Sequence, residues 1–144
     1  MRNFEIALYC DQEFEITESN NEHYKLIYHG SISPGFGFYP SPKWPNIFVR
    51  QINKSDIKSG YQASTFANYK GFKFHVDRYE NEKYRLTTGD EKVYAQLHLN
   101  MIDRGWYEIW VDKSEIEKMW EERKPSGYGF PMPEGLKKTQ ELNP

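Results

Sequence analysis

Residues 3–17, NFEIALYCDQEFEIT, decide the fold class of this chain. Phe4, Ile6 and Leu8 alternate with polar or small residues, and the same alternation resumes after the polar pair Asp11-Gln12. A period of two places neighbouring side chains on opposite faces of a β-strand. The stretch therefore predicts two half-buried strands, joined by a tight turn at Asp11-Gln12 into an antiparallel hairpin.

Most of the remaining chain shows the same period. Further strands are predicted over residues 24–28, 47–49, 61–69, 72–76, 84–88, 93–99 and 106–111. Thr88-Gly89-Asp90-Glu91 is predicted to be the loop of a hairpin, with glycine where a positive φ is needed. The close spacing of the first three strands predicts an antiparallel meander. The pattern leaves open whether the sheet is strongly curved or closes into a barrel.

One segment near the C-terminus has the spacing of a helix instead. Ser114 and Glu117 have the spacing of a capping box, and Pro125 would end the helix. One face of the segment is apolar, with an arginine stem extending it: Ile116, Met119, Trp120 and Arg123. The sequence therefore predicts an α+β fold, a predominantly antiparallel sheet with one C-terminal amphipathic helix packed on it. The expected organisation is a single β-rich domain over residues 1–133 and a polar tail over residues 134–144.

Composition limits the classes of function. Aromatic residues make up 17% of the 144 residues and all apolar residues 38%, so Phe, Tyr and Trp must fill much of the core. The formal net charge of −2 is not that of a nucleic-acid-binding protein, which normally has a basic face. The single Cys10 fits a reducing compartment. No stretch approaches the roughly 20 apolar residues of a membrane-spanning helix, and no signal peptide is recognised. We expect a cytoplasmic protein that binds neither nucleic acid nor a membrane.

The sequence has no recognisable catalytic motif. It contains no P-loop, no G-x-S-x-G elbow and no paired Cys or His spacing. One alternative remains, because His75 and Asp77 share the polar face of one predicted strand and His98 lies on the polar face of another. If these strands were neighbours, the three side chains could hold a metal ion or perform acid–base chemistry. We expect no cofactor, and the sequence favours binding over catalysis.

Two irregular segments combine proline and glycine with aromatic residues. They are residues 30–46, GSISPGFGFYPSPKWPN, and residues 125–133, PSGYGFPMP. A loop as long as the first is unusual inside a compact domain and is often functional. Its aromatic side chains either fold back to cap the edge of the sheet or form a contact surface for a partner.

The first 22 residues are locally acidic, with six carboxylates against Arg2 alone. Aromatic anchors supply affinity at a protein interface, and charges steer the association with a partner of opposite sign. The candidate partner-binding residues are therefore aromatic residues of the two irregular segments and acidic residues near the N-terminus. They are Phe36, Phe38, Tyr39, Trp44, Tyr128 and Phe130, together with Asp11, Glu13, Glu15 and Glu18.

Three functional hypotheses follow. The first is a small protein-binding module, best specified as an immunity- or antitoxin-type inhibitor that occludes a basic toxin or enzyme, such as a cationic nuclease. The second is a small-molecule-binding protein or metal-dependent enzyme with its site in a cup of the sheet. The third is a structural component of a phage or secretion assembly. The sequence fixes neither the oligomeric state nor the identity of the partner.

Overall fold

The computed structural model describes all 144 residues, which divide into two compact units. Unit 1 comprises Met1–Asn3, Ser64–Arg123 and Lys137–Pro144, and unit 2 comprises Phe4–Ala63 and Lys124–Leu136. The single domain expected over residues 1–133 stays a prediction, because a division by contacts does not show which part of the chain folds alone. No helix of the structure is both long and apolar enough to cross a membrane.

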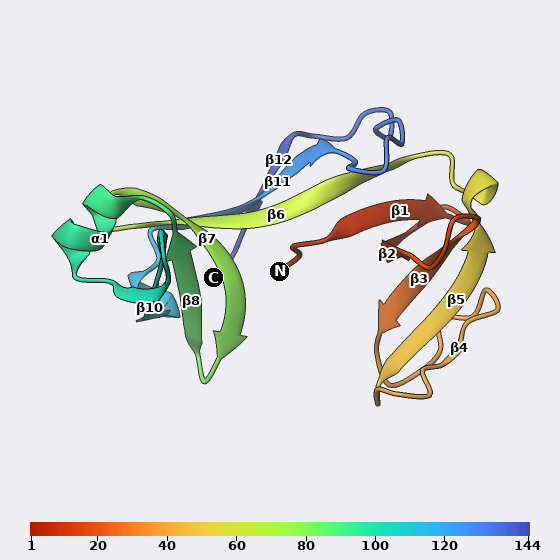
Figure 1. Cartoon of the computed structure of the whole chain (residues 1–144), viewed down its shortest axis with the longest axis horizontal. Helices are drawn as coiled ribbons and strands as arrows, with labels where there is room; N and C mark the ends of the chain where they lie inside the picture. Colours follow the sequence, from red (N-terminus) through yellow and green to blue (C-terminus); the bar gives the residue numbers. More distant parts are fainter. The chain divides into compact units, whose positions relative to one another are not determined.

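Unit 2 is built on antiparallel strands (Figure 1). Its sheet has the order β4-β5-β3-β2-β1-β6, to which β6 contributes its first residues. The strands are β1 (Glu5–Tyr9), β2 (Gln12–Glu18), β3 (His23–His29), β4 (Tyr39–Pro40), β5 (Ile47–Asn53) and β6 (Gly60–Tyr69). The meander predicted for the first three strands is confirmed, since β1 pairs with β2 and β2 with β3.

The first hairpin turns one residue earlier than expected. Cys10 and Asp11 form the two-residue loop, and both have positive φ values, 51° and 60°. Two positive φ values in succession are typical of a type I′ turn, whose twist matches that of the flanking strands. Gln12 is therefore the first residue of β2 rather than part of the turn.

The core of unit 2 lies on both faces of its sheet. One face buries Ala7, Phe14, Ile16, Tyr24, Leu26, Phe38, Ile52 and Ile57, and the other buries Ile6, Tyr61 and Ala63. The segment 124–136 packs against both groups. The carboxylate of Glu5 helps to hold this segment, because it accepts hydrogen bonds from the Ser126 hydroxyl at 2.9 Å and the Gly127 N–H at 2.6 Å.

Unit 1 contains the second part of the antiparallel structure. Its sheet has the order β6-β7-β8-β10-β9, and β11 pairs with β12. The elements are β7 (Phe72–Glu80), β8 (Lys83–Thr88), α1 (Glu91–Leu97), β9 (Asn100–Asp103), β10 (Trp106–Asp112), β11 (Lys118–Pro125) and β12 (Thr139–Leu142). The sheet is open, so the barrel considered from the sequence is not formed. Strand β12 lies within the segment expected to be a polar tail.

The helix predicted at the C-terminal end is wrong. Lys113–Glu115 form one 3₁₀ turn, and β11 follows at Lys118–Pro125. Met119 and Glu121 are buried at 3% and 4% exposure, whereas Trp120 between them is only partly buried, which is the alternation of a strand. The sequence showed no strand alternation here because the buried position after Met119 is occupied by the charged residue Glu121 instead of an apolar one.

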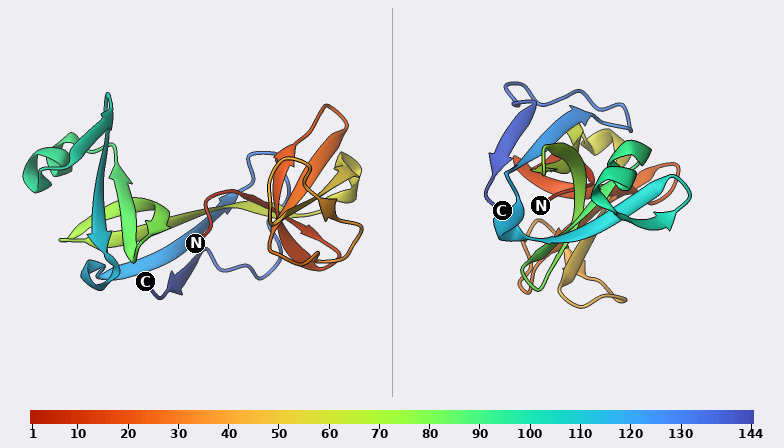
Figure 2. Two further views of the ribbon diagram at one scale, coloured as in Figure 1. Left: turned by 90° about the horizontal axis from the view of Figure 1, so that it is seen from below. Right: turned by 90° about the vertical axis from the view of Figure 1, so that its left-hand side faces the viewer.

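The only α-helix occupies residues predicted to form a strand. Along the chain, helix α1 follows β8 and precedes β9 (Figure 2). Its N-cap is Asp90, whose side chain accepts hydrogen bonds from the N–H groups of Lys92 and Val93. Asp90 thus satisfies amide groups that the first turn of a helix leaves free. The hairpin expected across residues 88–91 is replaced by this helix start.

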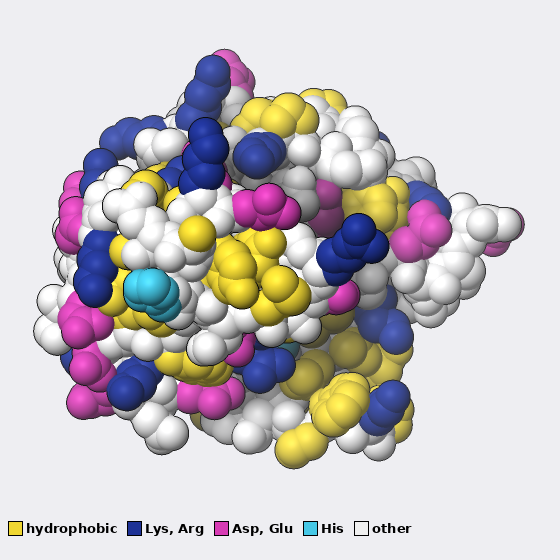
Figure 3. All heavy atoms as spheres, turned by 60° about the vertical axis from the view of Figure 1, so that its left-hand side comes forward, with side chains coloured by type: hydrophobic (Ala, Val, Ile, Leu, Met, Phe, Trp, Pro, Cys, Tyr) yellow, Lys and Arg dark blue, Asp and Glu magenta, His cyan; other side chains and the backbone are white.

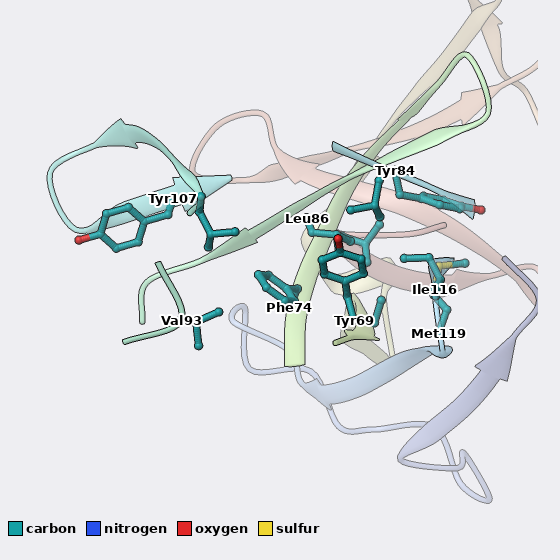
Figure 4. Packing of buried hydrophobic residues seen from close by; sticks show 12 residues of the cluster. Tyr69, Phe74, Tyr84, Leu86, Val93, Tyr107, Ile116 and Met119 are labelled. Carbon is teal, nitrogen blue, oxygen red and sulfur yellow. The ribbon is translucent and has the colours of Figure 1, made fainter. Parts of the chain in front are cut away.

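The core of unit 1 is rich in aromatic residues, as the composition predicted (Figure 4). Its cluster buries Ala67, Tyr69, Phe74, Val76, Tyr84, Leu86, Val93, Leu99, Tyr107, Val111, Ile116 and Met119. The rings of Tyr94 and Tyr107 stack at 4.1 Å between centroids, which joins α1 to β10. The side chains of Ile116 and Met119, expected on a helix face, are in this core, Ile116 from the residue after the 3₁₀ turn and Met119 from β11.

A buried ion cluster lies on β11. The Glu121 carboxylate accepts hydrogen bonds from the Arg2 guanidinium at 2.9 and 2.7 Å and from Arg123 Nε at 2.6 Å. Burial alone would raise the pKa of Glu121, but the hydrogen bonds and positive charges of the two arginines together hold it below its ordinary value. Glu121 is therefore ionised near neutral pH and ties the N-terminal residues to the rest of unit 1.

Candidate functional site: an aromatic cleft on unit 2

An open cleft of about 600 Å³ lies on one face of the sheet of unit 2. It is lined by alternate residues of β2, β3 and β5, by Tyr39 of β4, and by the loop that follows β4. The lining residues are Glu15, Thr17, Lys25, Ile27, His29, Tyr39, Ser41, Pro42, Lys43, Trp44, Ile47 and Val49. Its volume falls within the range of sites that bind ligands or side chains of a partner.

The floor of the cleft follows from strand register. Ile27 on β3 lies opposite Glu15 on β2 and opposite Val49 on β5, so these three side chains share one face of the sheet. Lys25 and His29 flank Ile27 at a period of two on the same strand and the same face. The floor is therefore apolar at its centre, with polar side chains on either side.

Two exposed aromatic side chains border this floor. Tyr39 is 48% exposed and pairs with Val49 through β4, and Trp44 is 57% exposed. A local turn positions the tryptophan, because the Ser41 hydroxyl accepts hydrogen bonds from the N–H groups of Lys43 at 3.3 Å and Trp44 at 3.1 Å. The base of the whole loop is closed by a hydrogen bond from the Gly30 N–H to the Asn46 carbonyl at 2.9 Å.

The charges in the cleft are unequally paired. Glu15 is 2.8 Å from His29 Nε2, and because a carboxylate only accepts hydrogen bonds, the ring nitrogen donates. Lys43 Nζ lies 5.3 Å from the centroid of the Trp44 ring, a cation–π distance. Neither Lys43 nor Lys25 forms an ion pair in the structure. The one carboxylate of the cleft is thus engaged, while two ammonium groups have no anionic partner.

The structure brings some of the predicted partner-binding residues to this cleft and not others. Tyr39, Trp44 and Glu15 line it. Among the other acidic residues, Glu13 shares the face of Glu15 and accepts a hydrogen bond from the Tyr61 hydroxyl. Glu18 forms an ion pair with Lys54 at 2.6 Å, and Asp11 is exposed in the first turn.

The remaining predicted aromatic residues lie against the opposite face of the sheet. Phe38 is buried, with its ring centroid 4.9 Å from that of Phe14, and Phe36 contacts the same ring edge-on at 6.3 Å. The rings of Tyr128 and Phe130 lie 5.2 and 5.3 Å from Tyr24. The first part of the loop over residues 30–46 therefore covers the core, and its second part borders the cleft. Whether the second part contacts a partner stays a prediction.

The alternative metal site is not assembled. No three His, Cys, Asp or Glu side chains are grouped so that they could hold a metal ion. His75 on β7 hydrogen-bonds with the Asn3 side chain at 3.0 Å, and Asp77 pairs with Arg85 at 3.3 Å. His98 is the C-cap residue of α1, with a φ of 55°.

His75 gives a prediction about pH. Partial burial lowers the pKa of His75 below 6.5, and the negative charge of Asp77 offsets part of that effect. Between the folded pKa and 6.5 the unfolded chain binds more protons, so lowering the pH through this window decreases the free energy of unfolding. We expect urea denaturation between pH 7.5 and 5.5 to show a smaller decrease for His75→Gln than for the native chain. The exposed His98→Gln variant is the control, and an equal decrease in His75→Gln would contradict the prediction.

Sequence reasoning missed the floor of the cleft. Lys25, Ile27 and Val49 were visible only as members of alternating strands, because their common face depends on the pairing of β3 with β2 and β5. The one available signal was that Ile27 continues an apolar run, Leu26-Ile27-Tyr28, and so gives β3 apolar side chains on both faces.

Charges of both signs are interspersed on the face that Figure 3 shows, without a basic stripe.

No curated protein and no solved structure matches the chain. A family model does match, over residues 1–127, and it carries the description Uncharacterised conserved protein UCP033725. The matched residues include every strand from β1 to β11 and the whole aromatic cleft. The chain therefore belongs to the family described as Uncharacterised conserved protein UCP033725.

Proposed function

We propose that this protein is a small protein-binding module that engages its partner through the aromatic cleft of unit 2. One observation carries the proposal: Tyr39 and Trp44 stand about half exposed over an apolar floor, at 48% and 57% exposure. Large aromatic side chains left in solvent cost hydrophobic free energy that burial at an interface recovers. Trp and Tyr are also the residues that contribute most to protein interfaces.

The narrower form of the proposal is an immunity- or antitoxin-type inhibitor in the cytoplasm. Such a protein acts by covering a surface of its target, so it needs shape and anchors rather than catalytic groups. The net charge of −2 supports steering toward a basic toxin or nuclease as a whole. The single, exposed Cys10 supports a reducing compartment.

A second candidate function is supported by the same cleft. Its volume of about 600 Å³ also suits a small organic ligand that stacks on Trp44 and hydrogen-bonds with Thr17 or Ser41. The two functions differ in what fills the cleft in the cell: a side chain of a protein in the first case, and a free small molecule in the second.

Cross-linking from inside the cleft tests the proposal. Trp44→p-benzoylphenylalanine, made in the native host and irradiated, is expected to give a discrete cross-linked protein that mass spectrometry identifies. Tyr79→p-benzoylphenylalanine is the matched control, because Tyr79 is similarly exposed, at 45%, but belongs to unit 1. The identified partner is then purified, and its affinity for the native chain is measured.

The same partner gives a prediction for the anchor itself. Trp44→Ala is expected to weaken binding by about 2 kcal/mol, roughly thirtyfold, which is the effect of truncating a central aromatic anchor. Trp106→Ala, at a 41% exposed tryptophan of unit 1, should leave the affinity unchanged. Equal affinities for Trp44→Ala and the native chain, measured by calorimetry, would reject the cleft as the binding site. Cross-links at positions 44 and 79 to the same set of proteins would reject a specific partner.

A further inference from the structure

The charges of the cleft indicate which kind of segment it accepts, if the cleft binds a protein as proposed above. Two cations line it, Lys25 on β3 and Lys43 in the loop after β4. The hydrogen-bond and ion-pair geometry of the structure gives neither of them an anionic partner, whereas the one carboxylate, Glu15, is bound to His29 at 2.8 Å. An occupant that carries carboxylates would therefore find two lysines that are free to pair with it. An occupant that carries cations would find only Glu15, which is already bound to His29.

The two lysines reach the cleft from different elements of unit 2. Lys25 is partly buried on the face of the sheet, opposite Thr17 and Gln51, so its ammonium group rises from the floor of the cleft. Lys43 is exposed beside Trp44, whose ring lies 5.3 Å from the ammonium nitrogen. In contrast, Lys54 is already paired with Glu18 at 2.6 Å. Both ammonium groups of the cleft are therefore available to an anionic occupant.

The shape of the floor suits an extended segment. Lys25, Ile27 and His29 form a row along β3, and residues i and i+4 of a strand are about 13 Å apart. An extended segment lying on this row presents every second side chain to the floor. An apolar side chain over Ile27 and Val49 would be covered on its outer side by the exposed rings of Tyr39 and Trp44.

We propose that the cleft binds an extended segment of the partner protein in which an apolar side chain is flanked by carboxylates. The carboxylates pair with the ammonium groups of Lys25 and Lys43, and the apolar side chain fills the space between the floor and Trp44. This assignment reverses the charges expected from the sequence, which predicted that acidic residues of this chain contact a basic surface of the partner. The whole partner can still be basic, because net charge steers encounter while the contact segment decides the fit.

The test uses the full chain and a defined peptide probe, acetyl-Ser-Asp-Ser-Leu-Ser-Asp-Ser-amide. Its two Asp and its Leu side chains face the same side of an extended backbone. Two matched probes carry Lys or Asn in place of both Asp residues, and glutarate serves as a free dicarboxylate. The readout is the indole N–H signal of Trp44 in a ¹⁵N-labelled sample. The other three tryptophans of the chain belong to unit 1 and act as internal references.

The Asp probe is expected to shift the Trp44 signal in a saturable way, and the Lys and Asn probes to bind more weakly. Lys25→Gln combined with Lys43→Gln should weaken the Asp probe about fivefold, the effect of losing two solvent-exposed ion pairs. Lys92→Gln, at an exposed lysine of α1, should change nothing. Added salt should reduce the preference for the Asp probe, because exposed charges are screened.

Several outcomes would overturn the inference. It fails if the Lys probe binds as tightly as the Asp probe, if the double lysine variant keeps full affinity, or if no probe shifts the Trp44 signal. If glutarate reproduces both the shift and the affinity, the occupant is a small dicarboxylate rather than a peptide segment. A partner that cross-links at position 44 but prefers the Lys probe would leave the proposed protein-binding function standing and remove only its charge assignment.

Discussion

Glu121→Gln is expected to lower the free energy of unfolding by about 3 kcal/mol, because the substitution removes the charge of a buried carboxylate that both the Arg2 and the Arg123 guanidinium groups contact. Removal of one partner of a buried ion pair costs about 3–5 kcal/mol. The lower end applies here, because 29% of the Arg2 side chain remains in solvent, although Glu121 itself is only 5% exposed. Urea denaturation at pH 7, followed by tryptophan fluorescence, measures the difference.

The neighbouring ion pair of β11 provides the control. Glu122→Gln removes a carboxylate that contacts Lys73 at 3.2 Å, but both side chains reach solvent, Glu122 at 24% and Lys73 at 51% exposure, so the expected loss is below about 1 kcal/mol. The contribution of Glu121 also depends on pH. Its folded pKa lies below the ordinary value of 4.5, so the stabilisation is present above pH 4.5 and is lost as the pH falls through the lower folded value. Equal destabilisation by the two substitutions would show that the cluster is not a special source of stability.

Gly60→Ala is the second substitution with a large expected effect. A Cβ atom at position 60 would lie 2.5 Å from the Ile6 carbonyl oxygen and 3.0 Å from the Phe130 ring. The nearer contact is backbone of the paired strand β1, which cannot move aside without disturbing the pairing of Ala7 with Gly60. We expect a loss of about 3 kcal/mol, at the upper end of the usual range for overpacking.

Gly89→Ala is the matched control for this steric argument. Its added Cβ would meet the Gly105 carbonyl oxygen at 3.4 Å and the Trp106 ring at 3.6 Å, which are ordinary contacts. Thermal unfolding of the two variants under the same conditions should show a clearly lower Tm for Gly60→Ala only. Similar Tm values would mean that the pairing of β1 with β6 tolerates a methyl group at position 60.

The alternation of apolar and polar residues predicted most strands of the structure. Phe72, Phe74 and Val76 are members of β7, and the strand predicted over residues 61–69 is β6. These predictions succeed because period two has a simple physical cause, the burial of one face of a pleated strand.

The two helix errors have specific causes. In β11 the inward position after Met119 is the ionised Glu121, and its burial depends on Arg2, which lies more than 100 residues away in the sequence. No local pattern carries that information. In α1 the information was local but ambiguous, because Asp90 followed by Glu91 suits a helix start as well as a turn. Val93 and Leu97 then fit both a helical and a strand period.

The candidate site was predictable in part. Tyr39 and Trp44 were candidates because they lie in a segment with too many prolines to form a regular buried strand, but the sequence did not separate their exposed rings from the others. The floor was not predictable, because it exists only once β3 lies between β2 and β5. Phe38 shows the converse limit, since its sequence context resembles that of Tyr39, while successive positions place one ring in the core and the other in solvent.

Strand β4 has a consequence for how this protein behaves at high concentration. It is the outermost strand of its sheet and consists of Tyr39 and Pro40 alone. An exposed outer strand presents unpaired backbone groups to which a strand of another copy can add. Pro40 has no backbone N–H to donate to an incoming strand, and a strand of two residues offers few positions for pairing. The dipeptide that displays Tyr39 therefore offers an incoming strand little to pair with at this edge of the sheet.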